Sequence, residues 1–127
     1  LGCGDARILI SAVKEFNAKK AVGYEIRKDI YKAALSRVEN EGLMDRVKII
    51  NDNFFKADLH EVTVVTLYLT NIVNEQLKPK LERELRSGTR IVSHDYEIRG
   101  WRDKRRIAFH DDTIYLYLVP QAFNWKT

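Results

Sequence analysis

Cysteine is almost absent from this sequence, and long apolar runs are absent altogether. The 127 residues contain one cysteine, Cys3, and two prolines. A single cysteine excludes an internal disulfide framework and is typical of a reducing compartment. No spacing of cysteine and histidine indicates a zinc site, and no metal is expected. No apolar run approaches the roughly 20 residues that a membrane-spanning helix needs, so we expect a cytoplasmic protein without a membrane partner.

Charge is nearly balanced, with one local exception. The sequence has 22 basic and 18 acidic residues and a net charge of +4, which favours an acidic partner only mildly. A dense basic cluster surrounds Trp101; it consists of Arg99, Arg102, Lys104, Arg105 and Arg106. It is interpreted either as a nucleic-acid patch with a stacking aromatic or, preferably, as a solvated, mobile loop beside the site.

The first residues, Leu1 to Arg7, resemble a nucleotide-binding glycine loop. Gly2 and Gly4 let the backbone approach a ligand closely. Apolar residues then recur at helical spacing and predict an amphipathic helix; they are Ile8, Leu9, Ala12, Val13 and Phe16. The positive end of this helix would face whatever the loop binds. An ordinary turn between a strand and a helix would produce the same short pattern.

The buried strand that normally precedes such a loop is represented only by Leu1. We therefore expect one domain, 1–127, that is N-terminally incomplete and lacks most of its first strand. Loss of this central strand would expose hydrogen-bonding edges on its two neighbours. Either the chain rearranges, or it self-associates through those edges, or the natural protein is longer.

The remaining pattern alternates strands and helices and predicts an α/β fold with a mainly parallel sheet, helices on both faces and an antiparallel C-terminal hairpin. Strands are predicted over 21–26, 46–50, 62–69 and 89–93, the last extended by 95–98. Helices are predicted over 29–41, ending at Gly42, and over 74–85, where Pro79 kinks the helix or lies in its first turn. The hairpin comprises 106–110, a turn at 111–112, and 114–119.

Candidate ligand-binding residues follow the predicted strands, where doubly wound sheets bind their ligands. Glu25 ends one strand and is placed to accept hydrogen bonds from ribose hydroxyls, with Ile26 beside it. After the next strand, an oxygen of Asp52 or Asn53 would accept from an adenine amino group while Phe54 packs against the ring. A solvated glutamate and a plain Asx turn are the structural alternatives. Asp5 holds an ammonium group or caps the first helix.

Two adenosine ligands fit this pattern: a dinucleotide such as NAD, and S-adenosylmethionine. Arg7 does not separate them, because it suits a pyrophosphate and a methionine carboxylate equally. The closing antiparallel hairpin favours the methyltransferase variant of the sheet.

Several motifs resemble the archaeal protein-lysine methyltransferases, class I enzymes related to the mitochondrial lysine methyltransferases. These motifs are the glycine loop 1–7, the strand that ends in Glu25, residues 53–55, the run 64–79 and, most specifically, Ser93 to Trp101. The resemblance implies S-adenosylmethionine-dependent methyl transfer to lysine ε-amines of many cytoplasmic proteins. Members usually carry a third glycine where this chain has Ala6. The cofactor-binding residues are then Gly2, Cys3, Gly4, Asp5, Glu25, Ile26, Asp52, Asn53 and Phe54.

The acceptor amine needs an apolar, aromatic channel that favours its neutral form. The candidate catalytic residues are Thr66, Tyr68, His94 and Tyr96, with Asp95 beside them. Tyr68 and Tyr96 are interpreted as channel walls or as half-buried strand residues. His94 is interpreted as a general base or, preferably, as a structural residue, and Trp101 is expected on a substrate-facing loop. Rival hypotheses are an RNA or small-molecule methyltransferase and a non-catalytic fragment of the family.

Overall fold

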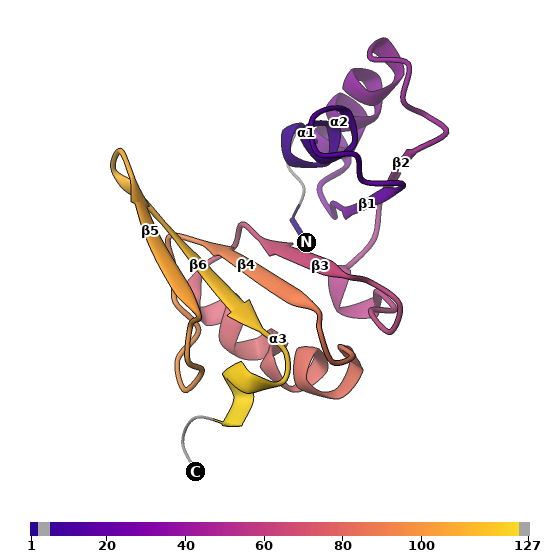
Figure 1. Cartoon of the computed structure of the whole chain (residues 1–127). Coiled ribbons are helices and arrows are strands. Elements are labelled where there is room, and N and C mark those ends of the chain that lie inside the picture. Colours follow the sequence, from indigo (N-terminus) through magenta and orange to yellow (C-terminus); the bar gives the residue numbers. More distant parts are fainter. Residues whose placement is uncertain (3–5, 125–127) are drawn as a thin grey trace. The chain divides into compact units, whose positions relative to one another are not determined.

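The computed structural model describes residues 1–2 and 6–124 as two compact units, Leu1–Ala57 and Asp58–Thr127. Each unit contains its own β-sheet with helices packed on it (Figure 1). None of the helices in the described part of the chain is long and apolar enough to cross a membrane.

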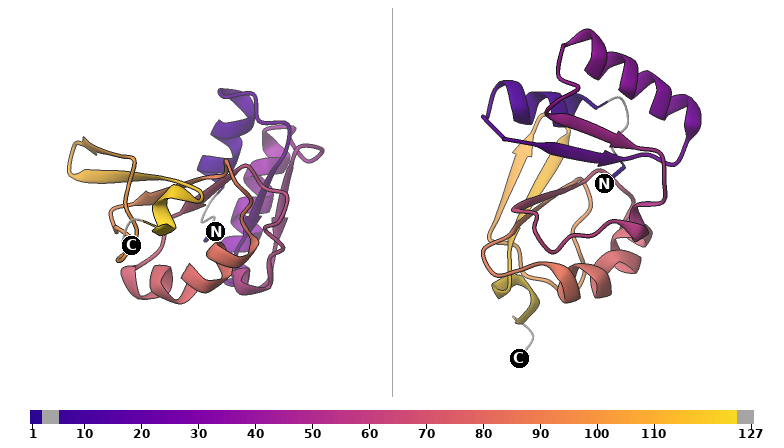
Figure 2. Two further views of the ribbon diagram at one scale, coloured as in Figure 1. Left: turned by 60° about the horizontal axis from the view of Figure 1, so that its bottom comes forward. Right: turned by 90° about the vertical axis from the view of Figure 1, so that its right-hand side faces the viewer.

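The first unit is a βαβ unit preceded by one helix. Its elements are α1 (Arg7–Lys14), β1 (Ala21–Tyr24), α2 (Lys28–Asn40), β2 (Val47–Ile50) and the 3-10 turn η1 (Phe54–Lys56). The strands β1 and β2 are parallel, and both helices lie over the same face of the pair (Figure 2, right). The core between helices and strands is formed by Ala6, Ile10, Val13, Ala34, Val38, Val47 and Ile49.

The predicted apolar face of α1 is partly wrong. Val13 is buried as expected, but Phe16 is 77% exposed and Ile8 is 45% exposed, whereas the neighbouring Ile10 is buried. The helix ends at Lys14, so Phe16 lies beyond it and has no turn to hold it against the core. The prediction that Ile8, Ala12 and Phe16 share one helical face required a longer helix than α1, which ends at Lys14.

The second predicted helix, 29–41, forms as α2 and ends where the sequence indicated. The backbone N–H of Gly42 donates to the carbonyl of Glu39, and that of Leu43 donates to the carbonyl of Val38. Gly42 has a φ of 69°, the left-handed conformation in which a helix commonly terminates. Ala34 and Val38 are fully buried on the apolar face of this helix, whereas Ala33 is exposed.

The second unit is a mixed four-stranded sheet of order β3-β4-β6-β5. Its elements are β3 (Val64–Leu67), α3 (Asn71–Glu84), β4 (Arg90–His94), β5 (Arg105–Phe109), β6 (Asp112–Leu118) and the 3-10 turn η2 (Gln121–Asn124). β3 and β4 are parallel, and β6 runs antiparallel to both β4 and β5. Helix α3 lies against one face of this sheet (Figure 1), and the predicted leucines Leu77, Leu81 and Leu85 are buried.

Two predictions in this unit need correction: the start of the helix and the extension of the strand that follows it. Helix α3 begins at Asn71 because the side chain of Thr70 caps the N–H of Val73, so Pro79 lies inside the helix and not in its first turn. Residues 95–98 do not extend β4. Asp95 adopts a positive φ of 66°, which ends the strand, and the Tyr117 hydroxyl accepts the N–H of Ile98 at 2.8 Å. Burial raises the pKa of Tyr117 to about 12.

The closing hairpin forms with its strands displaced from the predicted bounds. Its turn lies at His110 and Asp111, and His110 takes a φ of 56°. Among the described strands, β1 pairs only with β2, and β3 pairs only with β4. Within the described part of the chain, each of these two therefore has a strand neighbour on one side.

Gly42 offers a direct test of the helix end. A Cβ built on Gly42 would meet nothing within 4 Å, so Gly42→Ala changes only the backbone energy. We expect this variant to lower the free energy of unfolding by about 1 kcal/mol, since alanine resists a positive φ. Gly42→Asn is the matched control and should lose less, because asparagine tolerates that conformation. Urea unfolding measures both, and equal stability of Gly42→Ala and the parent would contradict the assignment.

Candidate functional site

The carboxyl ends of β1 and β2 bring together the residues predicted to bind adenosine. The N–H of Glu25 donates to the carbonyl of Ile50 at 3.0 Å, so the pairing of the two strands continues one residue past β1. The Asn51 amide nitrogen donates to the carbonyls of Glu25 (2.9 Å) and Ile26 (3.2 Å). Asn51 therefore fixes the backbone that carries both candidate residues. The sequence pattern did not single it out.

In the turn after β2, the polar side chains accept hydrogen bonds from backbone N–H groups of the turn itself. The side-chain oxygen of Asn53 accepts the N–H of Phe55 at 2.9 Å and caps η1. One oxygen of Asp52 accepts the N–H of Asn53 at 2.7 Å and lies 3.5 Å from the Lys56 ammonium. The Asx-turn alternative is therefore realised. Such a turn still orients the Asp52 carboxylate, which keeps further acceptor positions.

The chemistry at this edge fits an adenosine. The Glu25 carboxylate accepts the N–H of Arg27 at 3.1 Å and stays partly exposed, as a group that accepts from ribose hydroxyls must be. Ile26 is 65% exposed, and Phe54 is half-buried against Phe55. A carboxylate flanked by accessible apolar side chains offers both a polar contact for a sugar and a surface for a base.

The glycine loop is described at its two ends. Gly2 has a φ of 70°, and Ala6 is the residue before α1 with a φ of 71° and no exposed surface. Ala6 thus takes the left-handed conformation that suits glycine best, the residue that the family resemblance leads us to expect at this place. The predictions for Cys3, Gly4 and Asp5 lie outside the described residues.

In the second unit, the carboxyl ends of β3 and β4 bring Tyr68 and His94 together. Their rings are stacked, with centroids 4.2 Å apart and an angle of 10° between the planes. Tyr68 is 57% exposed and Tyr96 is 43% exposed, and neither belongs to a strand. Thr66 is half-buried in β3, in register with Val92 of β4. Three of the four candidate catalytic residues therefore lie at or just beyond the strand ends.

The turn after β4 is held from the sheet and from α3. The Ser93 hydroxyl donates to the carbonyl of Tyr96 at 2.6 Å, and the buried Asn74 amide reaches the same hydroxyl at 3.4 Å. The Asp95 carboxylate accepts the N–H of Thr113 at 2.9 Å. Asn74 and Ser93 belong to motifs noted in the sequence, but their spacing along the chain gave no sign that they meet.

The prediction for Trp101 was wrong. Its side chain is only 6% exposed and packs against the rings of Tyr117 and Phe123, while its indole N–H donates to Glu82. Trp101 is therefore a core residue of the second unit and is unavailable to stack on a substrate. The basic residues around Trp101 in the sequence indicated an exposed position, but its side chain is directed into the core.

The basic cluster is also not simply a loop. Arg105 and Arg106 belong to β5. Arg106 forms ion pairs with Asp103 at 2.9 Å and Glu97 at 3.6 Å, and its guanidinium lies 5.1 Å from the centre of the Tyr115 ring. The hydrogen bond with Asp103 raises the pKa of Arg106 and lowers that of Asp103.

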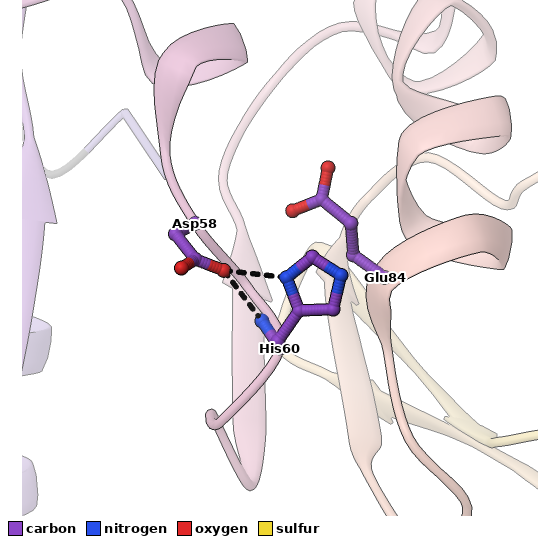
Figure 3. A group of neighbouring side chains, drawn as sticks. All are labelled: Asp58, His60 and Glu84. Atoms are coloured by element: carbon purple, nitrogen blue, oxygen red, sulfur yellow. Dashed lines mark hydrogen bonds and ion pairs between the residues drawn. The ribbon is translucent and has the colours of Figure 1, made fainter.

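Two groups in the described residues have the spacing of metal ligands: Asp58, His60 and Glu84, and His94, Asp95 and Asp112. In the first group, the His60 ring lies between the two acids (Figure 3), with its Nδ1 2.6 Å from Asp58. Glu84 already accepts from the Lys80 ammonium at 2.8 Å and from the N–H of Leu59 at 3.0 Å. Ordinary polar contacts thus account for this buried carboxylate.

Comparison with known proteins identifies the family. The profile of the ANTKMT methyltransferase domain matches residues 1–105, which extends over both units. The chain belongs to this methyltransferase family. The strand order, in which an antiparallel hairpin follows parallel strands, agrees with the class I methyltransferase fold.

Relatives support the same assignment. A protein-lysine N-methyltransferase of Saccharolobus islandicus is 52% identical over 95% of this chain and 78% of its own length. The adenine nucleotide translocase lysine N-methyltransferase of Mus musculus is 27% identical over 94% of this chain, which spans about half of that relative's length (52%).

Solved structures agree with the fold. An RNA methyltransferase of Salinibacter ruber, crystallised with S-adenosyl-L-homocysteine, has a TM-score of 0.90 and 39% identity; the match covers 94% of this chain and 78% of that one. The m1A22 tRNA methyltransferase of B. subtilis has a TM-score of 0.74 at 16% identity, covering 91% of this chain and 56% of that one, and shows the fold alone.

Glu84 gives a testable pH dependence. Burial works to raise the pKa of Glu84, but the hydrogen bonds from Lys80 and Leu59, together with the Lys80 charge, outweigh it and hold the pKa below its ordinary value of 4.5. A carboxyl whose pKa is lower in the folded state stabilises the fold above its unfolded-state pKa and loses that contribution as the pH falls through its folded-state pKa.

We therefore expect Glu84→Gln to lower the free energy of unfolding by about 2 kcal/mol at pH 7, since a charge-assisted hydrogen bond is lost. The difference from the parent should shrink as the pH falls below 4.5 and through the lowered folded-state pKa, where the parent carboxyl becomes protonated. Urea unfolding across this pH range measures it. Glu61→Gln, at an exposed position, is the control, and a deficit for Glu84→Gln that does not change with pH would contradict the assignment.

Proposed function

We propose that this protein transfers a methyl group from S-adenosylmethionine to ε-amines of lysines in proteins. The observation that carries the proposal is the 52% identity with a protein-lysine N-methyltransferase over nearly the whole chain. The family match runs through both units, which supports treating residues 1–127 as one methyltransferase domain. We further propose that the protein acts in the cytoplasm, as its single cysteine suggests.

The cofactor contacts are assigned to the edge formed by β1 and β2. Glu25 would accept from the ribose hydroxyls, with Ile26 and Phe54 against the adenine and Asp52 near its amino group. The glycine loop would approach the methionine part with its backbone. When bound, S-adenosylmethionine supplies a methyl group already activated by its sulfonium, so no metal is needed. The protein has chiefly to position the accepting amine.

The amine contacts are assigned to the residues at the ends of β3 and β4. Tyr68 and Tyr96 present partly exposed rings, which supports a role as walls that orient a lysine side chain. Removal of the amine from water between these walls disfavours the charged ammonium and so favours the neutral amine that can react. Thr66 lies in β3, two residues before Tyr68, and is assigned to the same group of amine contacts. The proton released by the amine passes to water.

RNA methylation is the second candidate function. It is favoured by the exposed basic side chains at Arg99, Arg102, Lys104 and Arg105, and by the 39% identity with an enzyme described as an RNA methyltransferase. The burial of Trp101 removes the stacking aromatic from this patch and weakens the RNA alternative. A fragment that does not bind cofactor is the remaining alternative function. Self-association through the edges of β1 and β3 stays a proposal about partners.

Cofactor binding tests the first half of the proposal. Glu25→Gln should weaken the binding of S-adenosylmethionine by about tenfold or more, because a charged acceptor for the ribose hydroxyls is lost. Isothermal titration calorimetry measures the affinity. Glu39→Gln, an exposed glutamate of α2, is the matched control and should bind like the parent. Equal affinities for both variants would refute the assignment of Glu25, and no binding by the parent would leave the fragment alternative.

The identity of the acceptor tests the second half. With S-adenosylmethionine labelled in its methyl group, we expect transfer to cytoplasmic proteins and not to RNA from the same extract, with methyl-lysine identified by mass spectrometry. Tyr68→Ala should lower the rate at least tenfold, whereas Tyr68→Phe, which keeps the ring, should retain most of it. Label confined to RNA, falling steeply with added salt, would instead establish the RNA alternative.

A further inference from the structure

His94 lies at the point where three parts of the second unit meet. It is the last residue of β4, it pairs with Ile114 of β6, and its ring stacks on Tyr68 beyond the end of β3. Asp112 is two residues before Ile114 in β6, so its side chain lies on the same face as His94 at a diagonal position. The side chain of His94 is 20% exposed, whereas those of its acidic neighbours are 38% and 51% exposed.

Each ring nitrogen of His94 lies near a carboxylate. Nε2 lies 3.2 Å from the Asp112 carboxylate, and Nδ1 lies 3.6 Å from that of Asp95. Asp95 is itself fixed by two contacts with Thr113: its N–H donates to the Thr113 carbonyl at 2.7 Å, and its carboxylate accepts the Thr113 N–H at 2.9 Å. A general base needs one nitrogen that faces the substrate. Here each nitrogen has a carboxylate oxygen within 3.6 Å.

We propose that Asp112 is a positioning residue that fixes the imidazole of His94 as a platform for the ring of Tyr68. This inference rests on the proposed function, in which Tyr68 orients the accepting amine. A residue of the β5–β6 hairpin thus determines the position of Tyr68, which follows a different strand, β3. The role of His94 is then to support Tyr68 and not to remove the proton from the amine.

The chain supplies a matched control at the neighbouring position. Asp111 is exposed and lies in the hairpin turn, one residue from Asp112 and outside the strand. Asp111→Ala and Asp112→Ala therefore remove the same group from adjacent positions. Asp112→Asn keeps an oxygen that can accept a hydrogen bond from the ring, so it should rescue the alanine variant.

The first measurement is structural and does not require activity. In nuclear magnetic resonance spectra of the whole protein, the parent should show contacts between the ring protons of Tyr68 and His94. We expect Asp112→Ala to lose them, and Asp112→Asn and Asp111→Ala to keep them, while circular dichroism shows the same fold for all. Retention of the ring contacts in Asp112→Ala would overturn the proposal, whether or not the protein methylates lysine.

The second measurement is kinetic. Asp112→Ala should lower kcat for lysine methylation by about tenfold with little change in KM for S-adenosylmethionine, because the amine is misplaced while the cofactor contacts stay intact. Asp112→Asn should restore most of the rate. A rate for Asp112→Ala equal to that of Asp111→Ala would contradict the proposal. Absence of lysine methylation by the parent would refute the proposed function instead.

A third comparison separates a platform from a general base. His94→Phe keeps a flat ring against Tyr68 and removes both nitrogens, whereas His94→Ala removes the ring as well. A platform predicts that His94→Phe is the more active of the two by several-fold. Equal loss in both variants would show that a nitrogen of His94 takes part in the reaction and would overturn the assignment.

Discussion

The parallel pairing of neighbouring strands is the constraint on which both groups of candidate residues depend. In β1–β2 and in β3–β4, the ladder of backbone hydrogen bonds brings two carboxyl ends to one edge of the sheet. Residues that are 20 or more positions apart in the chain then become neighbours. Glu25 meets the turn after β2 in this way, and Tyr68 meets His94. Because the register is also defined, each side chain is directed to a particular face.

The polar contacts around these edges serve mainly to hold the backbone. Asn51 binds two carbonyls after β1, Asn53 caps the turn after β2, and Ser93 holds the turn after β4. Exposed side chains, among them Ile26, Tyr68 and Tyr96, remain available to a ligand. This division is common in binding sites, where hydrogen bonds to loop backbones supply rigidity and accessible side chains supply the contacts.

The candidate residues divide between the two units of the fold. The residues proposed to bind cofactor come from one unit, and those proposed to meet the acceptor come from the ends of β3 and β4 in the other. Relatives described as acting on protein lysines and on RNA share the fold, so the fold does not choose the acceptor. In the proposed assignment, the choice falls to exposed side chains such as Tyr68 and Tyr96 and to the surface around them.

Sequence alone determined the order of elements, the family and the residues at the strand ends. Short apolar runs and glycines specify strands, helices and turns over a few residues, and the Ser93 to Trp101 segment carries the family resemblance in the same way. It predicted Glu25, Tyr68 and His94 by their places after strands. It could not place Trp101 in the core, end β4 at His94, or join Asp112 to His94. These depend on which side chains share a face across strands, and tertiary register alone decides that. Local patterns specify an element, whereas packing between elements specifies what each side chain contacts.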